Sequence, residues 1–259
     1  MFYCGTSGFS YDDWIGIYYP AGLPRKNWLS YYAQEFNALE LNSTYYVLPA
    51  VSTMESLARK TGGGFLFSVK ANREITHTRE HAEDACKSFI RILQPLIEAK
   101  KLGCILAQFP YSFNCLDSNR VYLERLKDWL AELPLVIEFR NTAWLNPRTL
   151  DWMRKNDVGF CCVDEPQLPG LLPPVAEVTG QNGYIRFHGR NAARWWKHEQ
   201  AWERYDYTYQ SDELAEWKPR IGQIAREAEN TFIFANNHWR GQSVDTIRQV
   251  RSMLDQLVM

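Results

Sequence analysis

The chain alternates strand-like runs with helical segments, and this alternation limits the folds open to it. Eight runs are rich in β-branched, aromatic and other apolar residues, and turn or helix signals separate them. These predicted strands are 2–8, 38–42, 65–70, 103–108, 135–140, 158–164, 183–188 and 231–236. Helices are predicted at 26–36, 51–60, 81–101, 117–133, 147–156, 211–229 and 242–257. The proline-rich segment 166–174 is expected to contain no regular helix.

Alternating strands and helices of this kind form either an open doubly wound sheet or a closed barrel. Eight such units in 259 residues favour the barrel, because barrels of this type use about 250 residues as one domain. No linker-like composition interrupts the alternation. We therefore predict fold class α/β and a single (β/α)8 TIM-type barrel domain over residues 1–259.

Charge and cysteine usage narrow the expected partners and location. The net charge of -1 does not point to nucleic acid or a membrane surface, so such a role would need a local patch. No apolar run approaches the roughly 20 residues that span a bilayer, so no membrane partner is predicted. The six cysteines show no CxxC spacing and lie largely in apolar runs. With no leader-like start, this pattern predicts reduced thiols and a cytoplasmic protein.

The alternation of side chains within each strand predicts which groups face the barrel lumen. In 183–188, Arg186 shares one face with His188, and Ile185 shares the other with Phe187. Since the face toward the helices should be apolar, the polar face is assigned to the lumen. The same reasoning places inward Cys4, Thr6, Glu40, Asn42, Ser68, Lys70, Gln108, Glu138, Arg140, Cys162, Asp164 and Asn236. The polar groups lie toward the strand C-termini, which predicts a site at that rim, the alternative being a self-satisfied polar plug.

Several short motifs at these strand ends occur together and in order. They are Gly5-Thr6-Ser7-Gly8-Phe9-Ser10-Tyr11, Glu40-Leu41-Asn42-Ser43-Thr44-Tyr45-Tyr46, Lys70-Ala71-Asn72-Arg73, Gln108-Phe109-Pro110, Glu138-Phe139-Arg140, Arg186-Phe187-His188-Gly189-Arg190 and Asn236-Asn237-His238. Through them the chain resembles the YecE-like family, a domain of unknown function, over nearly its whole length. The resemblance implies a TIM barrel distantly similar to the endonuclease-four and xylose-isomerase barrels, and no established reaction. Phe9 stands where tryptophan is expected.

The cationic groups at the rim predict a small anionic ligand. Lys70, Arg140, Arg186 and Arg190 together can neutralise a phosphate or carboxylate, and a buried cationic surplus is costly without an anion. The alternative is that Glu40, Glu138 and Asp164 balance them. The predicted ligand-binding groups are Asn42, Lys70, Gln108, Glu138, Arg140, Arg186, Arg190, Asn236, Trp195 and Trp196.

Three titratable groups at the rim are the candidates for catalysis. We expect Glu40, Asp164 or His188 to transfer protons in acid–base or hydrolytic chemistry, as in a hydrolase or isomerase acting on a phosphorylated substrate. The alternative for His188 is a hydrogen bond to a rim carboxylate. No cofactor motif is present. His77-Thr78-Arg79-Glu80-His81 matches H-x-x-E-H without its fold context, so no metal site is predicted, although one using His77 and rim carboxylates stays open.

The segment 190–209 mixes aromatic and basic residues. Trp195 and Trp196 with neighbouring arginines suit stacking on bases, so a nucleic-acid-binding or endonuclease-like role is the alternative function. Glu199 and Glu203 dilute the positive charge. The competing interpretation is a capping loop that packs its tryptophans on the barrel.

Overall fold

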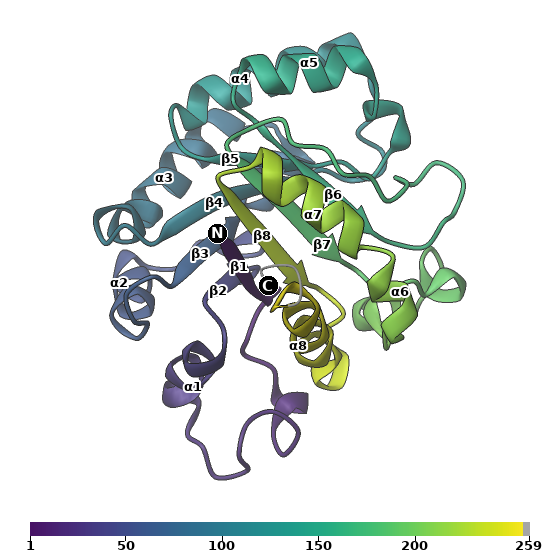
Figure 1. The fold of residues 1–259 in the computed structure, drawn as a ribbon. Coiled ribbons are helices and arrows are strands. Elements are labelled where there is room, and N and C mark those ends of the chain that lie inside the picture. The colour runs from purple at the N-terminus through teal and green to yellow at the C-terminus, as the bar shows by residue number, and fades with distance from the viewer. Residues whose placement is uncertain (256–259) are drawn as a thin grey trace.

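The computed structural model describes residues 1–255 as an eight-stranded parallel barrel with helices outside it (Figure 1). The strand order is β1-β8-β7-β6-β5-β4-β3-β2, so each strand lies beside its neighbour in the chain, as in a TIM-type barrel. The strands are β1 Phe2–Thr6, β2 Ala38–Leu41, β3 Leu66–Lys70, β4 Leu102–Gln108, β5 Leu135–Glu138, β6 Gly159–Asp164, β7 Asn182–Phe187 and β8 Asn230–Ala235. The predicted fold class is confirmed.

The helices follow the strands in the predicted alternation. They are α1 Trp28–Glu35, α2 Val51–Arg59, α3 Ala82–Glu98, α4 Asp117–Leu130, α5 Pro147–Lys155, α6 Ser211–Ala215, α7 Lys218–Glu227 and α8 Gln242–Asp255. The proline-rich segment between β6 and β7 contains no helix, as predicted. The predicted end of the last helix at residue 257 lies outside the described residues. Within those residues, no helix is both long and apolar enough to cross a membrane.

One of the predicted helices is in fact two separate helices. The range 211–229 was expected to form one helix, but α6 ends at Ala215 and α7 begins at Lys218. Pro219 lies in the first turn of α7. Proline has no amide hydrogen to donate to the preceding turn, so it favours a new helix start over continuation. The break leaves Trp217 between the two helices with its side chain fully buried.

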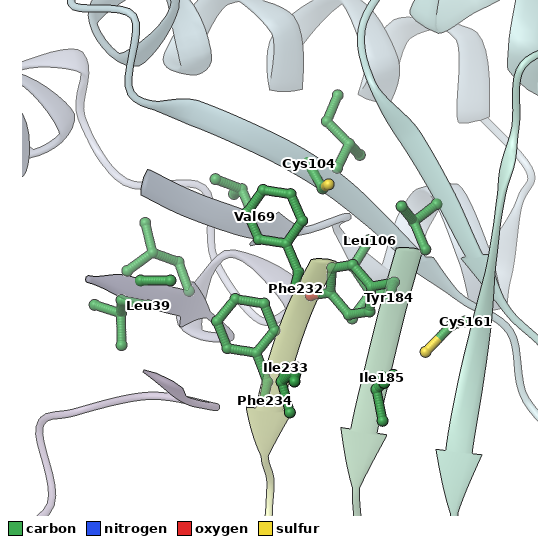
Figure 2. Packing of buried hydrophobic residues seen from close by; sticks show 14 of the residues in the cluster. Leu39, Val69, Cys104, Leu106, Cys161, Tyr184, Ile185, Phe232, Ile233 and Phe234 are labelled. Carbon is green, nitrogen blue, oxygen red and sulfur yellow. The ribbon is translucent and has the colours of Figure 1, made fainter. Parts of the chain in front are cut away.

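The lower part of the lumen is a packed aromatic core. The ring of Tyr184 on β7 lies 6.1 Å from that of Phe232 and 5.4 Å from that of Phe234, both on β8 (Figure 2). On the opposite face of the same strands, Ile185 pairs in register with Ile233. Aromatic side chains therefore fill the barrel at this level. Space for a ligand remains at the carboxyl ends of the strands.

Side chains close the barrel between β1 and β2. A single isolated bridge joins Ser7 to Glu40. Below it, Asn37 accepts from the Cys4 amide at 2.8 Å and donates to the Phe2 carbonyl at 2.9 Å. The Tyr32 hydroxyl accepts from the Thr6 amide at 2.7 Å and lies 3.1 Å from the Ala38 carbonyl oxygen. These two side chains satisfy backbone groups that a regular strand ladder would otherwise pair.

The predicted side-chain facing is wrong in β1 and β6. The hydroxyl of Thr6 contacts Tyr32 of α1, so Thr6 faces the helices. In β6 the thiol of Cys161 lies 3.8 Å from Glu138 in the lumen, whereas that of Cys162 contacts the Glu177 backbone outside. Cys4 and Asp164 share the outward faces of these strands. In β1 both alternating sets are small, aromatic or weakly polar, and in β6 only Asp164 at the end is strongly polar. Apolar contrast therefore could not identify the outer face correctly.

Candidate ligand site at the barrel mouth

A cavity of about 520 Å³ opens at the carboxyl ends of the strands. Five predicted ligand-binding residues line it, namely Lys70, Gln108, Arg140, Trp195 and Trp196. Further walls come from loops after β2 and β4 and from the segment 190–209. They add the aromatic side chains of Tyr45, Tyr46, Tyr111 and Tyr205 and a third cation, Arg204. Within residues 1–255, no carboxylate lines this cavity.

Arg186 holds two carboxylates together inside the barrel. Its two terminal nitrogens lie 2.6 Å from Glu40 Oε1 and 2.6 Å from Glu138 Oε2. All three side chains are buried, and burial of the guanidinium opposes its charge while the two glutamates favour it, with the net effect of raising its pKa. Glu40 also accepts hydrogen bonds from Ser7 and from Tyr184. Three side chains, Arg186, Ser7 and Tyr184, therefore donate to Glu40. Its predicted role in proton transfer stays a prediction.

Glu138 also connects this interior pair to the cavity wall. Its Oε1 lies 2.5 Å from Arg140 Nε, and Arg140 reaches Glu165 Oε2 at 3.2 Å. Burial would raise the pKa of Glu138, but Arg140, Arg186 and His188 hold it well below its usual range. The carboxylate of Glu138 is thus ionised and serves to fix two arginines. Arg140 is the member of this network that lines the cavity.

His188 is enclosed within the same network. Its Nδ1 lies 3.1 Å from the Asn236 side-chain amide and its Nε2 lies 3.2 Å from Glu138 Oε1. Burial and the nearby Arg140 lower the pKa of the imidazole well below its ordinary value. His188 is neutral and fully buried, and it is absent from the cavity wall. The imidazole thus contacts a rim carboxylate and, through Nε2, an Arg140 terminal nitrogen at 3.2 Å. Its predicted role in proton transfer stays a prediction.

Asp164 and Arg190 form a separate cluster on the helix side of β6. Asp164 accepts from Tyr209 at 2.5 Å, from the Trp217 indole at 2.7 Å and from Arg190 at 2.8 Å. Arg190 also lies 2.9 Å from Glu216 Oε2. The predicted inward facing of Asp164 is therefore wrong, and neither Asp164 nor Arg190 lines the cavity. Their predicted catalytic and ligand-binding roles stay predictions. These contacts attach the start and the end of the segment 190–209 to the barrel.

Asn42 also differs from its predicted placement. It follows β2, but it does not line the cavity. Its Oδ1 is buried without a hydrogen-bond partner in the described part of the chain.

The segment 190–209 lies over the mouth as a wall. Trp195 is buried, and the guanidinium carbons of Arg140 and Arg204 lie 5.5 Å and 5.4 Å from its ring centre. Trp202 stacks on Trp239 at 3.8 Å. Trp196 is 48% exposed. Two of the three tryptophans are thus used for packing, as the capping interpretation expected.

The electrostatic environment of the cavity disfavours further positive charge. Burial is the largest effect on Lys70 and, with Arg186 and Arg140, it lowers the pKa of the amine to about 7. His77 follows β3 on a turn of π-helix, Glu74–Thr78. Burial and the nearby Lys70, Arg73 and Arg79 lower its pKa to about 4. The cavity is cationic, and an anion would relieve this repulsion.

Sequence reasoning missed several groups at the site. Glu165 contacts Arg140, and burial raises the pKa of its carboxyl to about 7. It shares its alternation with Cys161 and Val163, so the correct facing of β6 would have revealed it. Arg204 and Tyr205 lay within the aromatic-basic segment but were not singled out. Among residues 1–255, no group of three or more His, Cys, Asp or Glu side chains is placed to hold a metal ion.

The closed parallel barrel and the cavity at its carboxyl end define a TIM-barrel protein with a cationic, aromatic-walled mouth. A family model described as protein of unknown function DUF72 matches residues 3–258. The chain belongs to this family, which confirms the YecE-like resemblance.

Similar proteins match either nearly the whole chain or less than half of it. UPF0759 protein YunF of Bacillus subtilis is 31% identical over 98% of this chain and 95% of its own length. UPF0759 protein YecE of Escherichia coli is 29% identical over 44% of this chain and 39% of its own. The crystal structure of a DUF72 family protein from Thermotoga maritima matches with a TM-score of 0.91 and 38% identity, covering 98% of this chain and 99% of that one.

Proposed function

We propose that the barrel mouth binds a small molecule that carries a phosphate or carboxylate and a planar or apolar body. The observation behind this proposal is that Lys70, Arg140 and Arg204 line one cavity whose described wall contains no carboxylate. Cations recognise the anionic group, and aromatic walls favour a flat body. The volume of about 520 Å³ suits a metabolite-sized ligand.

The three cations differ in how fully the protein neutralises them. Arg140 is paired with Glu138 and Glu165. In the described chain, Lys70 and Arg204 have no carboxylate partner, and Arg204 Nε donates to the Trp195 carbonyl at 2.9 Å. Buried or half-buried cations without a counter-charge are costly. A bound anion would supply that charge.

Calorimetry with phenyl phosphate tests this proposal, because the probe combines an anion with one aromatic ring. We expect binding that weakens with added salt, and a loss of about tenfold or more in affinity in Arg204→Gln, since a charge-assisted hydrogen bond contributes roughly 1.5–3 kcal/mol. The matched control is Arg194→Gln, since Arg194 belongs to the same segment, pairs with Glu203 and lies outside the cavity wall. No heat with the unaltered chain, or equal affinity in both variants, would contradict the proposal.

A second candidate, binding of single-stranded nucleic acid, is supported by the exposed rim. Trp196 is 48% exposed and meets Tyr111 edge-on at 5.1 Å, so one base could stack there. If this function operates, oligothymidylate should quench tryptophan fluorescence at low salt, and Trp196→Ala should remove the effect. Trp202→Phe is the control, because Trp202 is already stacked on Trp239. Absence of quenching at low salt would exclude this candidate.

A further inference from the structure

We propose that Lys70 is a catalytic amine, and that it forms an imine with an aldehyde or ketone that also carries the anionic group. This inference rests on the proposed anion-binding function. It adds the substrate class, a carbonyl compound bearing a phosphate or carboxylate, and it identifies the side chain that reacts.

The position of Lys70 makes its amine available to a ligand. Lys70 ends β3 and lines the cavity, and it is partly exposed there. Its Nζ lies 4.6 Å from the ring centre of Tyr45. Within residues 1–255 the amine forms no ion pair, because the two lumen carboxylates, Glu40 and Glu138, are held by Arg186 at 2.6 Å each. The amine therefore faces the cavity without a carboxylate partner.

The charged groups around Lys70 favour the neutral amine. Arg186 and Arg140 repel its cation, while Glu138 and Glu40 attract it, and burial adds the largest effect against the charge. His77, on the π-helical turn after β3, is neutral because its pKa is lowered to about 4. With a pKa of about 7, a substantial share of the amine carries a free lone pair at neutral pH. An ordinary exposed lysine does so only near pH 10.

The proposed step balances without a further reactant. The lone pair of Lys70 Nζ attacks the carbonyl carbon, a C–N bond forms, and the π electrons of the carbonyl move to its oxygen. The amine loses its two protons, which leave with that oxygen as water, and a C=N bond remains. Arg140 and Arg204 line the same cavity and are placed to hold the anionic group of the substrate.

Pyridoxal 5′-phosphate is a suitable probe, because it is a flat aromatic aldehyde with a phosphate. We expect an imine absorbance band when it is added to the full chain. Borohydride reduction followed by peptide mass spectrometry should place the label on Lys70 at least tenfold faster than on other lysines. The labelling rate should rise with pH through about 7 rather than 10.5, since only the neutral amine attacks. Lys70→Arg and Lys70→Met should both remove the fast label, and Lys60→Arg, at an exposed lysine, should retain it.

The outcomes separate this inference from the anion-binding proposal. If phenyl phosphate binds but Lys70 is labelled no faster than Lys60, the amine proposal is overturned and anion binding stands. If pyridoxal without its phosphate labels Lys70 as fast as the phosphate ester does, the amine proposal stands and anion binding is contradicted. Fast labelling that persists in Lys70→Arg would also overturn the amine proposal, because arginine retains the charge but forms no imine.

Discussion

Replacing Arg186 with methionine is expected to lower the free energy of unfolding by about 3–5 kcal/mol, the usual cost of removing one partner from a buried ion pair. Arg186 is fully buried and neutralises both Glu40 and Glu138 at 2.6 Å. Methionine keeps similar bulk but leaves two carboxylates in the interior, with Glu138 still beside Arg140. Urea unfolding followed by circular dichroism measures the loss.

The pH dependence of this loss is a second signature of the same substitution. In the unaltered chain the pKa of Glu138 is held well below its usual range, so its stabilising contribution is present at neutral pH and is lost as pH falls through that low value. Without Arg186, burial favours the protonated form of Glu138 more strongly, so the variant regains stability relative to the unaltered chain as pH falls from 7 toward 5. Urea unfolding at pH 7 and pH 5 should show that the difference in unfolding free energy between the variant and the unaltered chain is smaller at pH 5.

A matched control for Arg186 exists on the surface. Arg148 pairs with Asp117 at 3.1 Å, and both side chains are exposed. Arg148→Met should change the unfolding free energy far less, because exposed ion pairs contribute little. Equal losses of unfolding free energy in Arg148→Met and Arg186→Met would contradict the conclusion that Arg186 forms a stabilising buried ion pair with Glu40 and Glu138.

Gly5→Ala is expected to destabilise the protein by about 3 kcal/mol, or roughly 6–12 °C in Tm. The added methyl group would have to fit between β1 and β2, where the two strands are in close contact. A Cβ at this position would lie 1.9 Å from the Ala38 carbonyl oxygen and 2.7 Å from the Tyr32 hydroxyl. The carbonyl belongs to the β2 backbone and cannot rotate away. The substitution must therefore push β1 from β2, where Asn37 and Tyr32 join the two strands.

Thermal unfolding of Gly5→Ala should be compared with that of Gly22→Ala. A Cβ at Gly22 meets no atom within 4 Å, so this control should leave the Tm nearly unchanged. A Tm within about 2 °C of the unaltered protein for Gly5→Ala would contradict the described approach of the two strands. It would mean that β1 and β2 can separate enough to accept the methyl group at a loss of unfolding free energy below about 1 kcal/mol.

The architecture was predictable because local signals agree with the global fold. The alternation of apolar strands with amphipathic helices is visible in the sequence, and Asn146 before Pro147 marks the start of α5, where its side chain accepts the Thr149 amide at 3.0 Å. The break between α6 and α7 was missed because the helical pattern continues across it. Pro219 was the available signal.

The site was predicted in part, and the errors have a common physical origin. Where one face of a strand is strongly polar at its end, as for Lys70 or Arg140, the residue was correctly placed at the mouth. In β6 only the charge of Asp164 distinguished the two faces, and that charge is tolerated outside because Tyr209 and Trp217 donate to it. Pairing within the lumen depends on distances across the barrel, which no single strand encodes. The sequence therefore could not reveal that Arg186 would occupy both glutamates.

The pairing of β1 with β8 has a consequence for how the chain folds during synthesis. The amino group of Met1 donates to the Glu229 carbonyl, a contact between residues 228 positions apart, and the β1 ladder runs beside residues 231–235. Because β1 leaves the ribosome long before β8, its hydrogen-bonding edge toward β8 stays unpaired during most of translation. Non-local pairing of this kind slows folding and exposes strand edges to other chains. Amino-terminal fragments that stop before β8 should therefore engage chaperones far more strongly than the chain that contains it.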